Sequence, residues 1–418
     1  MLHIGIDDTD SKEGMCTTYL GAVLKDKLKE IAEIQSLKLV RLNPNIKWKT
    51  RGNGSIAMVV KTEDEKKVKS IVEKLVKENA EFDDKNTNPG IVYYTGKIPE
   101  EFKKFYHKTL HDIVEIKEAE ELANAHGAET LKFKNGRGII GALAAIGSDL
   151  QDHTYEIIAY RGRDKQGQKR NVDKKSVIQM DKATQPLTYN NMDYETGKIL
   201  ITPHSHCPVL FGIRGENTEV LKKAFSIVKT EDEIERTAIY ITNQCTDAHL
   251  EAVDKISEIR PYSSVEVKGK VKAPPRKIEG GHVIFTITDE SNTEIYCAAY
   301  EPTGDFRKII NKLKPGDIIT ASGGVKNTIG LTINLEKLEI QELIESYREQ
   351  NPICPECGKR MKSAGRGQGF RCKRCKTHEE KREKTRIERE LKPGVYQVPP
   401  RAMRHLSRPL GRSAGESR

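Results

Sequence analysis

With 418 residues, 36% of them hydrophobic and 32% charged, the chain has the composition of a polar globular protein with roughly three domains. Its longest apolar stretch, residues 138–147, is too short to span a bilayer and no signal sequence opens the chain, so we expect a cytoplasmic protein without a membrane partner. The net charge of +10 comes from residues 351–418, which carry 19 Lys and Arg against 7 Asp and Glu, and this asymmetry favours nucleic acid as a partner over a merely solvated tail.

Strand and helix patterns alternate along the first 260 residues. In the first hundred, apolar runs and helical spacing predict strand, helix, strand, strand, helix and strand at residues 2–6, 19–31, 37–42, 55–61, 68–76 and 91–94. This β-α-β-β-α-β order fits a ferredoxin-like unit. A second pass of the same order is predicted at residues 131–133, 139–146, 155–160, 209–213, 220–228 and 238–242. The polar stretch 161–191 inside this second pass contains no predicted element.

The pattern changes to strands from residue 265 onward. Five strands with one helix after the third are predicted at residues 265–271, 282–288, 294–300, 306–313 (the helix), 318–322 and 331–338. This is the element order of an OB-fold barrel, which commonly binds oligonucleotides, although other small all-β domains share such spacing.

Two CxxC pairs follow the predicted barrel, at Cys354, Cys357, Cys372 and Cys375. Four thiolates at this spacing can converge on one Zn²⁺, and a four-cysteine site is closed to substrate and therefore structural. A redox dithiol is the alternative, but a doubled pair favours zinc. We expect the resulting ribbon to hold four cations toward the phosphates of nucleic acid, namely Arg366, Arg371, Lys373 and Arg374.

Negative charge is concentrated directly after the first predicted strand, in Asp7, Asp8 and Asp10. Carboxylates this close repel one another unless a cation neutralises them, and Mg²⁺ is the first candidate. The next predicted helix begins near Thr17 and Thr18, and a helix N-terminus can bind phosphate. Carboxylates for Mg²⁺ beside such a terminus predict a nucleotide site, whereas the alternative is a cluster of capping and turn residues.

A second loop, between the second and third predicted strands, is basic and rich in glycine. Its residues Lys49, Arg51, Asn53 and Gly54 are candidates for binding phosphate, with an ordinary hairpin turn as the alternative. Residues 136–141 match the GxGxxG pattern, but the following strand ends on Ala-Tyr-Arg and not on an acidic residue, so a dinucleotide site is disfavoured.

Six segments together resemble the archaeal tRNA 2-agmatinylcytidine synthetases, which modify the wobble cytidine of a minor isoleucine tRNA. In chain order they are GIDDTDSKEGMCTTYLG, LVRLNPNIKWKTRGNG, NTNPGIVYY, GRGIIGALAAIG, CPVLFGIRGE and NPICPECGKRMKSAGRGQGFRCKRC. The resemblance implies a multidomain α+β protein with four parts: a kinase-like α/β domain (1–125), a ferredoxin-like domain (126–260), an OB-fold (261–345), and a zinc ribbon with a basic tail (346–418).

The resemblance also implies an activity and roles for residues. Such enzymes use ATP to phosphorylate the C2 oxygen of the cytidine in the CAU anticodon, and the amine of agmatine then displaces it. By similarity Asp7, Asp8 and Asp10 hold Mg²⁺, and Thr17 is the threonine that takes a phosphoryl group. The nucleotide site includes Gly14, Thr17, Thr18, Lys49, Arg51, Asn53 and Gly54. The candidates for holding the agmatine guanidinium are Asp112, Cys207, Pro208 and Glu216.

Two other functions remain open at this point. An OB-fold with a zinc ribbon can act as a non-catalytic nucleic-acid-binding module, which leaves the aspartate cluster without a role. A different ATP-dependent ligase could join another amine, such as lysine, to tRNA. We infer no obligate protein partner.

Overall fold

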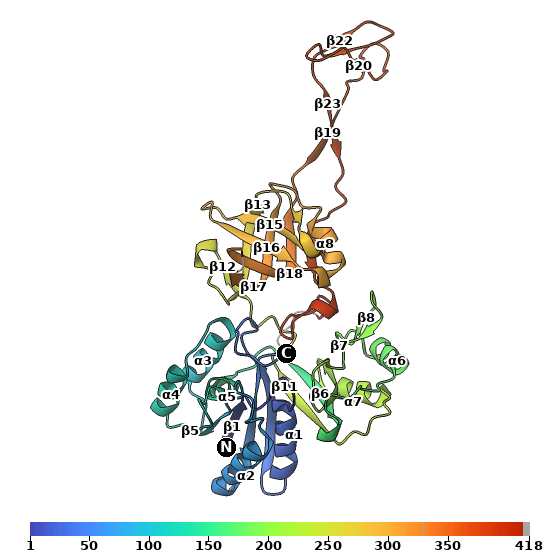
Figure 1. Ribbon diagram of the computed structural model, residues 1–418. Helices are drawn as coiled ribbons and strands as arrows, with labels where there is room; N and C mark the ends of the chain where they lie inside the picture. Colours follow the sequence, from blue (N-terminus) through green and yellow to red (C-terminus); the bar gives the residue numbers. More distant parts are fainter. Residues whose placement is uncertain (328, 413–418) are drawn as a thin grey trace.

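The computed structural model describes residues 1–327 and 329–412 and arranges them in three tiers (Figure 1). The lower tier is an α+β half that holds residues 1–250, the middle tier is a β-barrel, and the upper tier is a small ribbon on a narrow two-stranded stalk. Within the described residues, no helix combines the length and apolarity that crossing a membrane requires.

The first ninety-five residues form the predicted order of elements. They are β1 (Leu2–Asp7), α1 (Thr17–Leu28), β2 (Glu33–Arg41), β3 (Gly54–Lys61), α2 (Glu65–Asn79) and β4 (Gly90–Thr95). The strands lie in the order β4-β1-β3-β2, and each is antiparallel to its neighbours. In α2, the Asp64 carboxylate caps the helix by accepting from the Lys67 N–H at 2.9 Å, and Val68, Val72 and Val76 bury one face at a spacing of four residues.

The elements that follow complete this first sheet, so the predicted use of residues 131–133 and 139–146 as the first strand and helix of a second β-α-β-β-α-β pass was wrong. They are α3 (Glu100–His111), α4 (Ile116–Ala125), β5 (Glu129–Lys132) and α5 (Gly138–Gly147). Strand β5 pairs with β4. Helix α5 packs directly on β1, because Gly5 has no side chain: a Cβ there would lie 2.1 Å from the Ala142 carbonyl oxygen. The apolar run predicted a buried helix correctly but could not say which sheet buries it.

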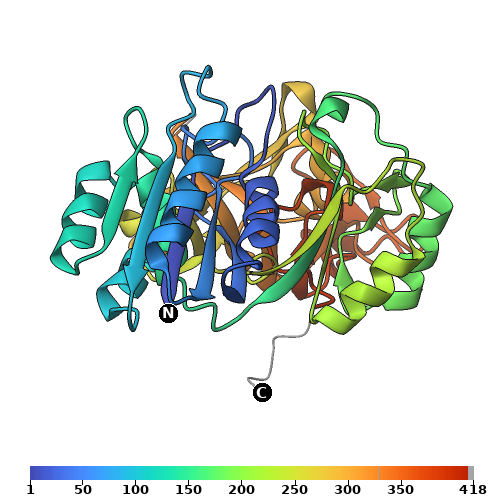
Figure 2. The same ribbon diagram turned by 90° about the horizontal axis from the view of Figure 1, so that it is seen from below.

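The second unit begins at β6 and includes a helix in the polar stretch. Its elements are β6 (Thr154–Tyr160), α6 (Lys174–Thr184), β7 (Thr188–Tyr189), β10 (Val209–Gly215), α7 (Thr218–Ile227) and β11 (Arg236–Thr242), with the small hairpin β8 (Met192–Asp193) and β9 (Lys198–Ile199) inserted. The strand order β11-β6-β10-β7 repeats that of the first unit. Strand β11 also pairs with β2 in parallel, so the two units share one continuous sheet, seen from below in Figure 2.

The middle tier is a closed barrel. Its strands are β13 (Ser264–Val271), β15 (Val283–Thr288), β16 (Glu294–Ala299), β17 (Ile318–Asn327) and β18 (Leu331–Glu342), with α8 (Asp305–Ile310) after the third. Pairing of β13 with both β15 and β17 closes the ring. The short strands β12 (Glu251–Val253) and β14 (Arg276–Lys277) extend it at the edges. The predicted OB-fold order is confirmed.

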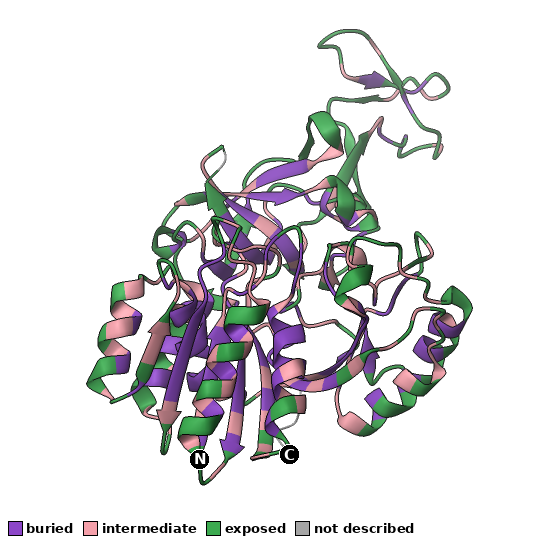
Figure 3. Ribbon diagram, turned by 60° about the horizontal axis from the view of Figure 1, so that its bottom comes forward, coloured by how far each residue is buried: buried purple, intermediate pink, exposed green. Residues whose placement is uncertain are grey.

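The chain leaves the barrel, builds the ribbon and then returns. The stalk is the pair β19 (Ser346–Gln350) and β23 (Glu383–Ile387), and the ribbon carries β20 (Lys362–Ser363), β21 (Phe370–Arg371) and β22 (His378–Glu379). Figure 3 shows that the ribbon is mostly exposed, whereas the strands of the lower tier are mostly buried. Strand β24 (Gly394–Gln397) then pairs with β18.

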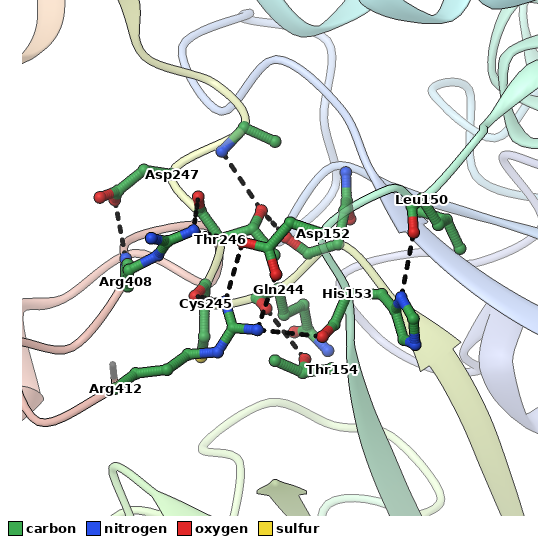
Figure 4. A network of polar contacts seen from close by, with 12 residues as sticks. Leu150, Asp152, His153, Thr154, Gln244, Cys245, Thr246, Asp247, Arg408 and Arg412 are labelled. Carbon is green, nitrogen blue, oxygen red and sulfur yellow. Dashed lines mark hydrogen bonds and ion pairs between the residues drawn. The ribbon is translucent and has the colours of Figure 1, made fainter. Parts of the chain in front are cut away.

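The C-terminal tail, residues 398–412, runs between the barrel and the lower tier. Leu406 is buried in the core of the first unit. Arg412 Nη2 lies 2.7 Å from Asp152 Oδ1 (Figure 4), and Arg408 pairs with the same Asp152. Arg412 Nε also lies 2.9 Å from Glu216. The described part of the tail is therefore an ordered strap and not a solvated segment.

One buried carboxylate on the barrel joins the tiers. Glu336 on β18 lies 3.0 Å from His249 Nε2 and 3.0 Å from Arg404 Nε, and it accepts a hydrogen bond from the Ser407 hydroxyl. His249 ends the lower tier, and the other two residues belong to the tail. Glu336 thus fastens the barrel, the lower tier and the tail to one another.

Candidate active site

The aspartate cluster lies where β1 ends, in a loop held by its own polar contacts. Asp8 has a φ of 60°, a left-handed conformation that aspartate tolerates better than most residues. The Asn88 N–H donates to Asp8 Oδ2 at 3.2 Å, and the Thr87 hydroxyl donates to the Asp10 carbonyl at 2.8 Å. The first contact orients the Asp8 carboxylate, and the second holds the backbone at Asp10.

The three carboxylates have different neighbours. Arg137 Nη2 lies 2.8 Å from Asp8 Oδ2, and Arg51 pairs with Asp10. Asp7 has no ion-pair partner among the described residues. Burial, together with the charge of Asp8, raises the pKa of Asp7 to about 7. Burial also raises the pKa of Asp8 to about 6, although Arg137 opposes the increase.

This environment suits a cation, although the cluster alone does not form a complete metal site. Among the described residues, only the four ribbon cysteines bring three or more potential ligand atoms within 4.8 Å of one another. A buried carboxylate without a counter-charge would nevertheless ionise more readily beside a bound cation. Asp7 therefore fits a divalent ion whose remaining ligands come from phosphate or water.

Arg137 is a site residue that the sequence analysis missed. It lies directly before α5, inside the GxGxxG match, and the glycines of that match allow close packing. A Cβ on Gly138 would lie 2.4 Å from the Gly90 nitrogen, and one on Gly141 would lie 1.9 Å from Asp7 Oδ2. The signal that could have found Arg137 is a cation directly before an apolar helix.

A first pocket of about 800 Å³ joins the aspartate cluster to the β2–β3 loop. The structure brings together here most of the residues predicted to bind nucleotide and metal, and the lining also includes Trp48, Asp112 and Arg137. The predicted members are Asp7, Asp8, Asp10, Lys49, Arg51, Asn53 and Gly54.

The β2–β3 loop is held by the groups that surround it. Asn53 donates to the Asn43 carbonyl at 3.0 Å, and Lys49 donates to the Pro44 carbonyl. Burial lowers the pKa of Lys49 to about 8, with contributions from Arg404 and Lys326. Arg51 also donates to the Met15 carbonyl at 2.6 Å, so it links this loop to the start of α1.

A second pocket of about 970 Å³ lies between the two units and contains the start of α1. Thr17 and Thr18 line it, and the Thr9 hydroxyl donates to the Thr17 hydroxyl at 3.1 Å. Gly14 lies instead beside Gln166 and Glu81 and is not part of either lining. The two pockets share Asp10, Arg51, Gly52 and Gly54, so they meet across the Asp10–Arg51 ion pair.

The four candidates for holding agmatine do not lie together. Cys207 lines the second pocket, and the neighbouring Pro208 uses its carbonyl to accept from the Arg161 N–H at 2.9 Å. Asp112 lines the first pocket and lies 3.0 Å from Arg260. Glu216 lines neither pocket, since its carboxylate pairs with Arg412 of the tail.

The ribbon cysteines form a compact cluster, as their spacing predicts. The Sγ atoms of Cys357 and Cys372 lie 3.6 Å apart, and all four sulfurs lie within 4.8 Å of one another. This geometry suits tetrahedral zinc. The predicted tRNA-binding cations, Arg366, Arg371, Lys373 and Arg374, are all exposed on the ribbon.

An OB-fold barrel, a four-cysteine ribbon and a carboxylate-lined pocket together define a multidomain enzyme that acts on nucleic acid. Comparison with protein families agrees: residues 3–71 match the TiaS TCKD domain and 136–249 the TiaS FLD domain. Residues 265–341 match an OB-fold nucleic acid binding domain, and 351–391 match the TiaS C-terminal zinc ribbon domain.

Relatives over the full length fix the family. The chain is 49% identical to the isoleucine tRNA 2-agmatinylcytidine synthetase TiaS of Methanosarcina mazei, over 98% of this chain and 97% of that protein. It is 46% identical to the TiaS of Pyrococcus horikoshii, over 98% and 97% of the two chains. The chain therefore belongs to the TiaS family of isoleucine tRNA 2-agmatinylcytidine synthetases.

Solved structures agree with this assignment. Apo TiaS superposes with a TM-score of 0.91 at 43% identity and covers 100% of this chain and 98% of its own. A complex of TiaS with its isoleucine tRNA and ATP gives a TM-score of 0.90 at 43% identity, and a complex of TiaS with that tRNA, AMPCPP and agmatine gives 0.88 at 40%. Each covers 100% of this chain and 98% of its own.

Proposed function

We propose that this chain uses ATP to attach agmatine to C2 of the wobble cytidine of the minor isoleucine tRNA, so that the tRNA decodes AUA in place of AUG. Membership of the TiaS family supports this function. One structural observation supports the assignment of this function to particular residues. Two pockets meet across the Asp10–Arg51 ion pair, one lined by carboxylates and basic loop residues and the other by Thr17 and Thr18. A phosphoryl donor bound in the first pocket would thereby lie beside acceptors in the second.

The reaction needs an activated oxygen. The C2 carbonyl oxygen of cytidine is a poor leaving group, and phosphorylation by ATP converts it into a good one. The primary amine of agmatine then attacks C2, and the oxygen departs with the phosphoryl group as phosphate. The target base has to leave the anticodon stack to reach either pocket.

The residue roles follow from this placement. Asp7, Asp8 and Asp10 would hold Mg²⁺, which neutralises charge on a transferring phosphoryl group when bound. Arg51 and Lys49 would bind phosphate oxygens, and Asn53 and Gly54 shape the same loop. Thr17 would take a phosphoryl group, since it stands at the start of α1 in the second pocket.

The remaining roles concern agmatine, tRNA and the domains. The turn at Cys207 and Pro208 would hold agmatine in the second pocket, with Asp112 approaching from the first. Glu216 would have to exchange its Arg412 partner to take part. The ribbon would bind tRNA through its exposed cations. We assign residues 1–125 to the kinase-like domain and 126–260 to the ferredoxin-like domain, with β5 and α5 of the second domain packed on the sheet of the first unit.

The mass of the wobble nucleoside tests this function. The protein would be incubated with a transcript of the minor isoleucine tRNA, ATP, Mg²⁺ and equal agmatine and lysine, and the tRNA then digested. We expect cytidine carrying agmatine, and none from Asp8→Asn, which keeps a residue that tolerates a positive φ. Cytidine carrying lysine would identify another ligase, and unchanged cytidine on tightly bound tRNA would identify a binding protein.

A further inference from the structure

A third cavity, of about 1000 Å³, lies where the lower tier, the barrel and the tail meet. It is bounded by the β2–β3 loop, by the end of β17 and by residues 403–406 of the tail. Its lining contains five arginine or lysine side chains and a histidine: Arg41, Lys49, Arg51, Lys326, Arg404 and His405. No carboxylate lines the cavity within the described parts of the chain.

Among the described residues, only two of these cations form an ion pair with a carboxylate. Arg51 pairs with Asp10, and Arg404 pairs with Glu336. Arg41 bonds to the Gln244 side chain and the Gly52 carbonyl, which are both neutral. Over residues 1–327 and 329–412, neither Lys49 nor Lys326 forms an ion pair with a carboxylate. Within the described residues, Lys49, Lys326 and Arg41 therefore present positive charge to the cavity without a direct ion-pair partner, although the carboxylate of Glu156 acts on Arg41 from nearby.

The tail closes one side of the cavity. His405 is exposed to the cavity, and its Nδ1 lies 2.8 Å from Arg214 Nη2. The β2–β3 loop can approach it because residue 52 is glycine: a Cβ there would lie 3.0 Å from His405 Cδ2 and 3.1 Å from Arg41 Nη1. The positive charge of Arg41, with a smaller contribution from Arg214, lowers the pKa of His405, so a neutral imidazole lies among the cations.

The position of the cavity indicates which anion enters it. It shares Arg51 and Gly52 with both pockets of the active site, and Lys326 belongs to the barrel. An RNA strand that runs from the barrel to the active site therefore crosses it. Grooves for single strands bind the sugar–phosphate backbone through such cations.

We propose that this cavity binds the backbone phosphates next to the target cytidine of the tRNA, with Lys326 and Arg41 as the principal contacts. The inference rests on the proposed function, because it takes tRNA as the substrate. It adds a binding site built partly from the C-terminal tail. The phosphates of ATP are the other source of the same chemistry, and the test separates the two.

The test measures the affinity of Lys326→Gln for the minor isoleucine tRNA at several salt concentrations, together with its ATP affinity. One phosphate contact on a single strand changes the salt slope by about 0.7, which is about fivefold in Kd near 0.1 M salt. We expect both changes, with ATP affinity unaltered. The matched control is Lys66→Gln on the exposed side of α2, at the opposite end of the lower tier, which should leave both affinities unchanged.

A second arm locates the contact on the RNA. A tRNA ligated from synthetic pieces would carry one uncharged methylphosphonate linkage, placed on either side of the target cytidine. At one of these positions it should weaken binding to the unaltered protein about fivefold and add less than twofold to Lys326→Gln. Independent, multiplicative losses at both positions would overturn the proposal.

Two further outcomes separate the proposals. A loss of ATP affinity in Lys326→Gln, with tRNA affinity unchanged, would assign the cavity to the nucleotide and overturn the inference while leaving the proposed function intact. Failure of the unaltered protein to bind the minor isoleucine tRNA would contradict the proposed function itself, and the inference with it.

Discussion

The zinc ribbon and the C-terminal tail follow one another in the chain and are both rich in cations, yet those cations have different partners. Arg366, Arg371, Lys373 and Arg374 of the ribbon are exposed, and within the described chain none of them forms an ion pair. In the tail, every arginine from 401 to 412 pairs with a carboxylate of the body. The pairs are Arg401–Asp193, Arg404–Glu336, Arg408–Asp152 and Arg412–Asp152.

The difference shows that a basic segment can serve two physical purposes. Exposed cations keep their hydration and are available to phosphate, so we expect those of the ribbon to bind a polyanion. The tail arginines are partly or, at Arg412, fully buried and have lost much of their hydration, and removing one takes an ion-pair partner from a carboxylate, so their value lies in holding the fold together. The charge excess of residues 351–418 predicted a nucleic-acid partner. That excess, however, includes both the exposed cations of the ribbon and the paired cations of the tail.

The largest effect should follow removal of the ribbon metal. The ribbon core is a small cluster around Cys354, Met361, Phe370 and Cys372, too small to fold alone, whereas structural zinc supplies about 10–16 kcal/mol in small domains. Cys372→Ser should lose zinc and unfold the ribbon while the body melts normally. Zinc content and tRNA affinity measure this, with Arg371→Gln as the control that keeps zinc. A folded, zinc-free ribbon would contradict the account.

Neutralising the four exposed ribbon cations together should weaken binding and leave folding alone. Replacement of Arg366, Arg371, Lys373 and Arg374 by glutamine should reduce tRNA affinity roughly a hundred- to thousandfold near 0.1 M salt. The free energy of unfolding should change by less than about 0.5 kcal/mol, as for other surface substitutions. Equilibrium binding and urea unfolding measure the two quantities. Unchanged affinity would show that the ribbon does not contact phosphate.

The opposite result is expected for one buried arginine of the tail. Arg412→Met leaves Asp152 and Glu216 without their shared partner, which should cost about 3 kcal/mol, near the lower limit for buried pairs because both carboxylates are partly exposed. Urea unfolding measures this loss. Arg366→Met on the ribbon is the matched control and should change stability by less than about 0.5 kcal/mol. Equal stability of the two variants would contradict the claim that the tail arginines, unlike the ribbon cations, stabilise the fold.

The smallest effect concerns acid. Burial alone would raise the pKa of Glu336, but His249, Arg404 and Ser407 outweigh it and lower the pKa to about 2. Because this pKa lies below that of an unfolded glutamate, the stabilisation is complete above about pH 5. It is lost as the pH falls toward 2, on the order of 2–3 kcal/mol. Urea unfolding between pH 6 and 3 measures this decline, which Glu336→Gln should flatten. An equally steep decline in the variant would contradict the role of Glu336.

How much of the fold the sequence predicts depends on where each segment is buried. The strands of the barrel and the cysteine cluster follow from local spacing alone. Helix α6 was not predicted from the sequence, because its buried face includes Ser176, Asp181 and Thr184, whose polarity masks the helical spacing of apolar residues. Their polar groups are satisfied locally: Asp181 accepts from Asn191 at 3.0 Å. Such pairing is invisible before the fold is known.

The candidate site shows the same limit. The residues of the aspartate cluster and of the β2–β3 loop were predictable, because each group is contiguous in the chain. Arg137, which pairs with Asp8 from 129 positions away, and His405 in the tail were not. No local pattern assigns a partner at such separation. The tail lacks any periodicity, since its burial depends on ion pairs with scattered carboxylates.

Hydrogen–deuterium exchange of the protein with and without the minor isoleucine tRNA tests the central contrast most directly. In the free protein, amides of the tail should exchange slowly, because Arg408 N–H donates to Asp247 at 2.7 Å and Arg412 N–H to the Pro409 carbonyl at 2.9 Å. Amides near residues 364–376 of the ribbon should exchange faster and gain protection when tRNA binds. A tail that exchanges rapidly until tRNA is added, with a ribbon that tRNA does not protect, would contradict the account.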